Sequence, residues 1–262
     1  MSKVTSSVLI GATLYEFRMQ LRRKALWIAT GIFFALTLFV SQGPWQFPSS
    51  MLVIQILAFW TQELQTFMPV AFGILLADRL PRDRLLRADE LLDSLPGSPS
   101  ERFLGKYIGA TLATLLPLFL IHLAGVVYVA VDQASAEAIP LGLAMFAAAS
   151  LPGLLFVAAF SISCPVVIWV PLYQFLFTGY WFWGNWLLQG PQSPLYIPVP
   201  TLSGTLLTPA GYYAATGLFG VPDFVLRATA WEGLSSIGLL VAFGVAALYA
   251  AHRYLTWRKS TR

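Results

Sequence analysis

The chain has 262 residues, of which 57% are hydrophobic and 11% are charged, and its formal net charge is +4 at pH 7. Soluble domains carry about 25% charged residues, so this composition excludes an ordinary globular domain and predicts an all-α integral membrane protein. A single cysteine, Cys164, excludes an intramolecular disulfide and disfavours a cysteine-based metal cluster, so we expect no metal site.

Residues 8–24 show helical periodicity with one apolar face and one basic face. Leu14, Phe17 and Leu21 form the apolar face, and Arg18 and Arg22 lie on the other. This pattern predicts an amphipathic helix that lies in the membrane interface. The alternative is a water-exposed start of the first membrane span. We expect no cleaved signal peptide, because the charged region is long and no small-residue cleavage site follows Val40.

Apolar segments predict six membrane spans in a single transmembrane domain, residues 1–262. A span needs about 20 apolar residues. We expect the spans at 26–41, 52–77, 107–131, 139–162, 166–188 and 233–252. Turn residues separate them at 43–45, at 132–137 and at Ser163–Cys164–Pro165. No Lys or Arg anchors the last of these turns, so a re-entrant pair is the alternative to two full crossings there.

The basic residues predict the orientation of these spans. All Lys and Arg residues except Arg227 fall into three blocks, at 3–24, 79–106 and 253–262. Cytoplasmic loops collect Lys and Arg, whereas translocated loops do not. We therefore expect a multi-pass protein of the cell (cytoplasmic or inner) membrane with both termini in the cytosol. The same rule explains the net positive charge, so we expect no nucleic acid partner.

The cytoplasmic loop at 78–106 is expected to be folded. Leucines alternate with charged residues between Asp83 and Leu95, and Pro96–Gly97 ends this predicted helix. Ser98–Pro99–Ser100–Glu101 then supplies a cap, a first-turn proline and an acidic first turn for a helix that continues into the third span. The leucines need a surface to pack against, which indicates a docking element.

The predicted extracytoplasmic loop at 189–232 is long, rich in proline and poor in charge. Loops of this length are functional or disordered, and the low charge favours an ordered segment apposed to the membrane. Aromatic residues crowd its start: Tyr180, Trp181, Phe182, Trp183 and Trp186. They suit an interfacial aromatic belt better than a ligand cage.

Polar residues in the second span are candidates for a translocation path. Gln62, Glu63 and Thr66 stand together, and Glu63 lies roughly 22 Å from the inner boundary of the hydrocarbon core. A charge facing lipid is costly, so Glu63 is expected to face the bundle and line the outer part of the path. The alternative is an interfacial Glu that reaches the outer headgroups.

The loop and the third span together resemble the ABC-2 type permeases, the membrane subunits of a class of ATP-driven transporters. The resemblance rests on Arg87, on Glu90 to Leu92 and Ser94 to Pro96, on Gly105–Lys106–Tyr107, and on Gly109. The layout of the rest of the chain is similar: a basic amphipathic N-terminal helix, six spans, a long outer loop before the last span and a short basic tail.

The resemblance implies a dimer of six-span permeases, as a homodimer or heterodimer, each docked on a separate ATPase subunit. The implied coupling residues are Arg84, Arg87, Asp89, Glu90, Leu91 and Leu92 in the loop, with Arg18 and Arg22 in the N-terminal helix. Glu90 is expected either to pair with one of these two arginines or to remain solvated. The implied function is export of a substrate, and the few fixed charges along the path favour an amphipathic or hydrophobic one.

ATP and Mg are expected on the partner ATPase, because this chain has no P-loop. Its one Gly–Lys pair, Gly105–Lys106, is preceded by Ser100 where a P-loop has glycine and is followed by Tyr107 where a P-loop has Ser or Thr. We expect no catalytic residues, since neither His122 nor His252 has a motif partner. The alternatives are a secondary transporter or channel without an ATPase and, less favoured, an integral-membrane enzyme.

Overall fold

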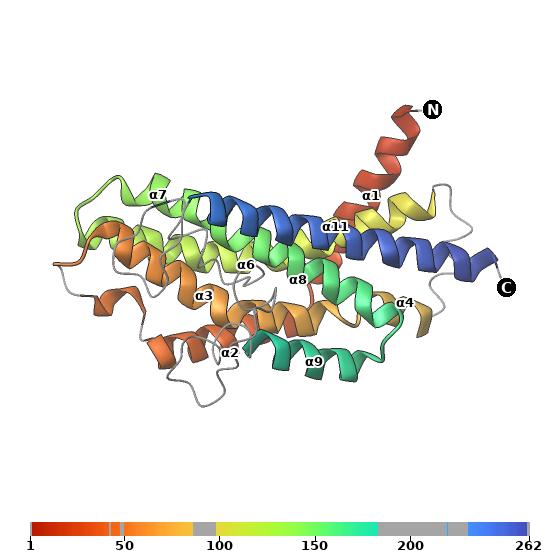
Figure 1. Ribbon diagram of the computed structural model, residues 1–262, viewed down its shortest axis with the longest axis horizontal. Coiled ribbons are helices and arrows are strands. Elements are labelled where there is room, and N and C mark those ends of the chain that lie inside the picture. The colour runs from red at the N-terminus through yellow and green to blue at the C-terminus, as the bar shows by residue number, and fades with distance from the viewer. Residues whose placement is uncertain are drawn as a thin grey trace.

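The long helices of this protein lie side by side along one axis (Figure 1). The computed structural model describes residues 2–41, 43–47, 50–85, 98–182, 219 and 230–260. All regular elements in these ranges are helical, which confirms the all-α fold class. Helix α1 (Ser2–Leu21) projects at an angle from the end of the bundle at which the C-terminus also lies.

Successive lengthwise helices run in opposite directions (Figure 1). They are α2 (Lys24–Ser41), α3 (Val53–Leu76), α6 (Pro99–Asp132), α7 (Ala138–Met145) with α8 (Leu151–Ser163), α9 (Val170–Phe182) and α11 (Ala230–Ser260). A π-helical turn, Phe146–Ser150, joins α7 to α8, and the short α4 (Arg79–Leu85) follows α3.

Four stretches of the described chain are long and apolar enough to cross a membrane. They are Lys24–Gln46, Pro99–Asp132, Ala138–Val166 and Ile237–Arg258. Their apolar side chains are widely exposed: Phe39 is 84% exposed, Val131 76% and Val245 60%. Exposed apolar surface of this extent on long helices is consistent with a membrane protein.

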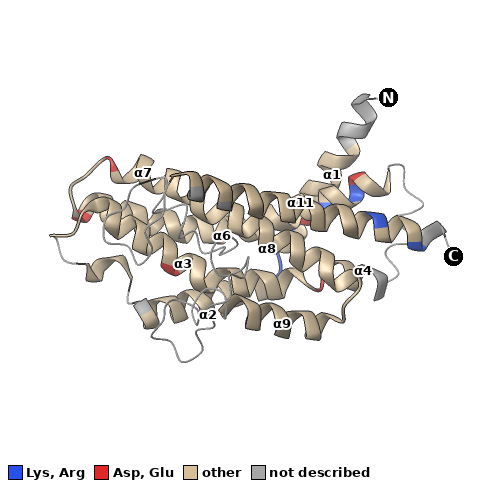
Figure 2. Ribbon diagram, viewed as in Figure 1, with Lys and Arg blue, Asp and Glu red and all other residues tan. Residues whose placement is uncertain are grey.

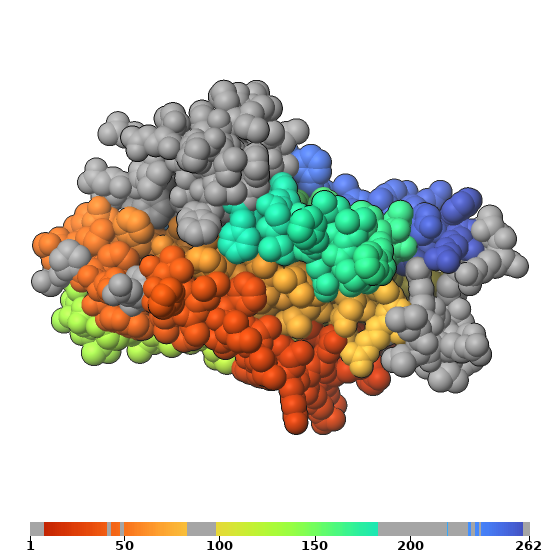
Figure 3. All heavy atoms as spheres, turned by 90° about the horizontal axis from the view of Figure 1, so that it is seen from below, coloured from red at the N-terminus to blue at the C-terminus, as the bar shows by residue number. Residues whose placement is uncertain are grey.

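Helix α3 lies at the centre of the bundle. It supplies buried residues to the apolar core along its length, from Ile56 to Leu76, and α2 and α9 flank it (Figure 3). Its 24 residues extend about 36 Å, enough to cross a hydrocarbon core of about 30 Å. It is not one of the four most apolar stretches, and it carries buried polar residues: Thr61, Gln62, Gln65 and Thr66.

The helix bounds agree with most of the expected span positions. Spans 26–41, 107–131 and 139–162 fall within α2, α6 and α7–α8, and span 52–77 extends one residue beyond α3 at each end. Span 166–188 is described as far as residue 182, and α9 occupies it from Val170 onward. The predicted turn at Ser163–Cys164–Pro165 is confirmed as a short 3-10 helix, Cys164–Val166.

The C-terminal helix is longer than the span predicted for it. We expected the last span at 233–252, but α11 runs from Ala230 to Ser260. The pair His252–Arg253 marks the end of the apolar stretch and not the end of the helix, because Lys and Arg are good helix formers. Most of the predicted outer loop at 189–232 lies outside the described residues, and its last residues already belong to α11.

The predicted start of α6 is confirmed in detail. Ser98 is the N-cap, and its Oγ accepts a hydrogen bond from the Glu101 backbone N–H at 3.2 Å. In return, the Ser98 backbone N–H donates to Glu101 Oε2 at 3.0 Å. This reciprocal pair is a capping box, with Pro99 in the first turn. The loop at 78–106 therefore leads into a defined helix start, continuous with a membrane-length helix.

Ser98→Ala is expected to destabilise the start of α6 by about 1 kcal/mol, because the capping acceptor is lost. Thermal unfolding of the purified protein in detergent measures the effect. Glu101→Gln is the matched control, since glutamine preserves the reciprocal bond of a capping box. Equal losses in the two variants would show that the charge of Glu101, and not the cap, stabilises this helix end.

Candidate functional site

Helix α1 packs closely on α6 at two glycines. A Cβ atom at Gly105 would lie 2.6 Å from the Ala12 Cβ, and one at Gly109 would lie 2.8 Å from the Glu16 Cβ. Both distances are shorter than a carbon–carbon contact allows. The two helices therefore approach this closely only because α6 has no side chain at either position, as small residues permit in membrane helix pairs.

A buried carboxylate lies at this crossing and binds two cations. Glu16 is 5% exposed, and Arg79 donates from Nη2 to its Oε2. Lys106 Nζ lies 3.6 Å from Glu16 Oε1. Arg79 begins α4 and Lys106 belongs to α6, so one side chain of α1 connects both ends of the loop at 78–106. We call Glu16, Arg79 and Lys106 the Glu16 cluster.

The Glu16 cluster carries one more positive than negative formal charge. Arg79 is 4% exposed and Lys106 is 8% exposed, so both cations are removed from water. Arg79 Nε has no hydrogen-bond partner among the described residues. Glu16 therefore offsets part of the cost of burying these two cations, because an unpaired buried charge is costly.

A second ion pair lies beside the Glu16 cluster. Arg23 Nη2 donates to Asp78 Oδ2 at 2.9 Å, and Arg23 Nη1 donates to Asp78 Oδ1 at 3.3 Å. The pair joins the α1–α2 turn to the α3–α4 turn. It is bidentate but more exposed, with side chains 19% and 38% accessible, so it contributes less than the buried cluster.

The structure places the predicted coupling residues of α1 on its outer side. Arg18 and Arg22 are exposed. Of the predicted apolar face, Leu14 is 48% exposed, whereas Phe17 and Leu21 are half-buried. The buried contact is instead made by Glu16 and Gln20. Both the basic face and Leu14 remain accessible to a membrane or to another protein.

The predicted coupling residues of the loop fall at or beyond the edge of the described residues. Arg84 belongs to α4. The others lie outside the described residues: Arg87, Asp89, Glu90, Leu91 and Leu92. A pairing of Glu90 with Arg18 or Arg22 therefore stays a prediction. The acid that binds cations near the loop is Glu16, which sequence reasoning missed.

The C-terminal helix is also connected to the start of α6. Ser100 Oγ lies 2.8 Å from His252 Nε2, and the His252 ring packs against Phe103. The described Lys and Arg residues gather at this end of the bundle, where both termini lie (Figure 2). The basic residues that predict the cytosolic side are thus brought together in space.

The structure brings two of the three translocation-path candidates together. Gln62 and Thr66 are buried one turn apart on α3, and Thr66 Oγ1 donates to the Gln62 carbonyl at 2.9 Å. The Trp181 indole N–H of α9 donates to the Thr66 carbonyl at 2.7 Å. Glu63 is half-buried, and its place in the helix turns it about 100° away from Gln62. The three residues therefore do not share one face.

His122 is a buried residue that joins two helices. It is 1% exposed, and its Nε2 donates to the Gly142 carbonyl of α7 at 3.0 Å. Its own carbonyl accepts from the Trp60 indole at 3.3 Å. Within the part of the chain that the structure describes, no three His, Cys, Asp or Glu side chains gather as a metal site would require.

Two sequence signals could have identified the Glu16 cluster. Glu16 is the only acidic residue before Glu63, and it stands within a basic segment. The second signal is the motif that contains Gly105–Lys106–Tyr107 and Gly109. Its glycines allow α1 to approach α6 closely, Lys106 pairs with Glu16, and Tyr107 Oη donates to the Leu155 carbonyl at 3.1 Å.

Comparison with known proteins does not place the chain in a family: no family model matches it, and a search of curated proteins finds no match. The class that fold and composition define is a helical protein with membrane-length apolar helices. A finer function rests on the geometry of the site and on the resemblance of the loop.

Proposed function

We propose that this chain is the permease subunit of an ABC-2 type transporter. It crosses the cell membrane six times with both termini in the cytosol, and it pairs with a second permease chain. Each permease docks on a separate ATPase subunit that binds ATP and Mg. Hydrolysis there drives export of an amphipathic or hydrophobic substrate.

The Glu16 cluster is the observation that carries this proposal. One carboxylate on α1 binds Arg79, where the loop begins, and Lys106, where it ends. The resemblance assigns docking on the ATPase to the N-terminal helix and to this loop. Elements that are joined by a buried ionic contact can move together when the ATPase closes, as rigid-body coupling requires.

The arrangement of the long helices supports the proposed topology. They run alternately in opposite directions, and the described Lys and Arg residues gather at one end (Figures 1 and 2). Cytosolic membrane flanks collect these residues. Helix α3 has the length for a crossing, and its buried polar residues are compatible with one because they face the interior of the bundle.

Co-purification tests the proposal directly. The tagged chain, expressed with the ATPase encoded beside it, is expected to retain that ATPase through detergent extraction and gel filtration. Adjacent reading frames for an ATPase and a second permease are the corresponding genomic observation. Transport by the isolated chain in vesicles, with no ATPase present, would contradict the proposal and favour a secondary transporter.

Glu90→Gln is expected to lower substrate-stimulated ATP hydrolysis about tenfold, because coupling through the loop loses a charge while the permease fold keeps its contacts. ATPase activity of the reconstituted complex measures the change, and gel filtration checks assembly. Glu137→Gln is the matched control, since this acidic residue lies at the other end of the bundle. Equal activity of the two variants would remove Glu90 from the coupling element.

A further inference from the structure

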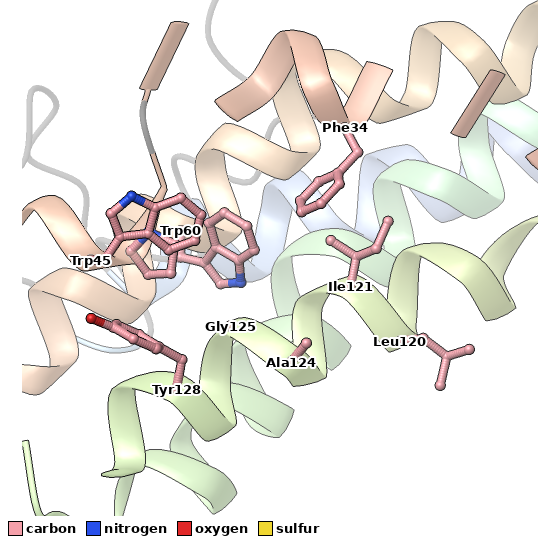
Figure 4. Close-up of a pocket in the computed structure, with 9 residues that line it drawn as sticks. Phe34, Trp45, Trp60, Leu120, Ile121, Ala124, Gly125 and Tyr128 are labelled. Atoms are coloured by element: carbon pink, nitrogen blue, oxygen red, sulfur yellow. The ribbon is translucent and has the colours of Figure 1, made fainter. Parts of the chain in front are cut away.

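An apolar pocket of about 320 Å³ opens between α2, α3 and α6, at the end of the bundle opposite the Glu16 cluster (Figure 4). Trp60 of α3 is 2% exposed and forms an inner wall, with the Phe34 ring edge-on to it at 6.5 Å. Gly125 of α6 lies against the same indole, where a Cβ would clash with the ring. The wall is therefore flat and closely packed.

The lining of this pocket excludes water and charged ligands. Its residues are aromatic, aliphatic, Pro or Gly, and no charged side chain of the described chain lines it. The Trp60 N–H already donates to the His122 carbonyl at 3.3 Å. A buried water needs two to four polar partners, which this surface does not offer. An empty pocket forfeits dispersion contacts, so the occupant is expected to be apolar.

The pocket is continuous with the apolar surface that the membrane-length helices expose. Trp45, Leu120 and Tyr128 form its rim and are 52%, 49% and 38% exposed. Beyond the rim, Phe39 and Val131 are among the most exposed apolar residues of α2 and α6. In a bilayer, lipid covers this surface, so the pocket opens toward acyl chains and not toward water.

The dimensions of the pocket match one leaflet. Leu120 and Tyr128 lie eight residues apart on α6, which corresponds to about 12 Å along the helix. Half of a hydrocarbon core is about 15 Å deep. Tyr128 lies one turn before the end of α6 at Asp132, and the Trp45 ring packs edge-on against it at 6.1 Å. Trp and Tyr are typical of the level of the headgroups.

We propose that this pocket binds one acyl chain of a bilayer phospholipid, from the leaflet opposite the basic end of the protein. Trp45 and Tyr128 lie at the level of the ester groups, and the chain extends along α6 past Ala124 toward Leu120. Binding depends on packing against rigid aromatic walls, because burial from lipid into protein gains no hydrophobic energy. The site requires neither ATP nor a partner subunit.

Photocrosslinking in vesicles tests this site. The full chain is reconstituted in phosphatidylcholine with a small fraction of phosphatidylcholine that carries a diazirine in the middle of one acyl chain. After irradiation, mass spectrometry of peptides locates the adducts. We expect adducts concentrated on the pocket residues of α2, α3 and α6, even when unlabelled lipid is in large excess.

Ala124→Phe fills the pocket from α6 and is expected to lower the pocket adducts about tenfold. Ala124 is exposed and lines the pocket, so the larger ring does not overpack the core. Ala246→Phe is the matched control, because Ala246 is an exposed alanine of α11 outside the pocket. This control variant is expected to keep the wild-type adducts.

Two results would overturn the proposal. The first is labelling spread evenly over the exposed faces of α2, α6 and α11, or unchanged in Ala124→Phe, which would show ordinary annular lipid. The second is loss of the pocket adducts during ATP-driven turnover of the assembled transporter, which would show that the occupant is cargo. Since the basic test needs no ATPase, its failure is distinct from failure of the permease proposal.

Discussion

Glu16→Gln is expected to destabilise the protein by about 3–5 kcal/mol, the loss typical when one partner of a buried ion pair is removed. The substitution removes the carboxylate that binds Arg79 and Lys106, two buried cations. Glutamine can accept a hydrogen bond but cannot neutralise either charge. Thermal unfolding in detergent measures the effect, and we expect the transition to fall by roughly 10 °C.

Asp78→Asn is the matched control for this prediction. It removes the carboxylate of the neighbouring pair, whose side chains are 19% and 38% accessible. Solvent screens such a pair, so its loss is expected to cost no more than about 1 kcal/mol. Equal destabilisation by the two variants would show that burial does not distinguish the Glu16 cluster.

A double variant separates charge from packing. Adding Lys106→Met to Glu16→Gln removes one of the two cations that Glu16 binds and keeps an apolar side chain of similar length. We expect it to recover part of the stability lost in the single variant, because residues in one ionic network couple non-additively. A further loss of stability in the double variant would mean that Lys106 contributes through contacts other than its charge.

Local signals predicted the helices and their ends. Ser98 and Glu101 stand three residues apart, so the capping box could be predicted from adjacent residues alone. The turn at Ser163–Cys164–Pro165 was predicted for the same reason, since proline and short polar residues act locally. The end of α11 was placed too early, because polarity ends a membrane span without ending a helix.

Contacts between distant helices could not be predicted in the same way. Glu16 and Arg79 are 63 residues apart, and periodicity shows which residues share a face but not which face meets which helix. The apolar pocket was harder still to predict, since its lining residues come from three helices and a turn. Gly109 was recognised as part of a motif, but only the structure shows that α1 crosses there.

The two ends of the bundle therefore differ in chemistry. At the basic end, helices are joined by ions and close glycine contacts, which depend on precise separation. At the other end, aromatic rings surround a pocket that an acyl chain can fill. A change in the α1–α6 separation is expected to act mainly on the basic end, because the close glycine contacts of α1 lie there.

Gly109→Ala is expected to weaken the contact of α1 with α6. The added Cβ would clash with the Thr13 carbonyl oxygen, would lie 2.8 Å from the Glu16 Cβ, and would lie 3.1 Å from the Phe17 backbone nitrogen. Backbone atoms cannot rotate away, so α1 must shift. Overpacking of this kind costs about 1–3 kcal/mol, which exceeds the ~0.5–1 kcal/mol gained when Ala replaces Gly in a helix.

Gly11→Ala is the control, made by the same substitution within α1. A Cβ at Gly11 would meet nothing within 4 Å, so this variant is expected to gain the ~0.5–1 kcal/mol of helix propensity without a clash. Thermal unfolding is therefore expected to shift in opposite directions for the two variants. Because the shift of α1 also separates Glu16 from Lys106, Gly109→Ala is expected to retain less ATPase on co-purification than Gly11→Ala. A rise in stability for both variants would show that α1 does not pack on α6 in the folded protein.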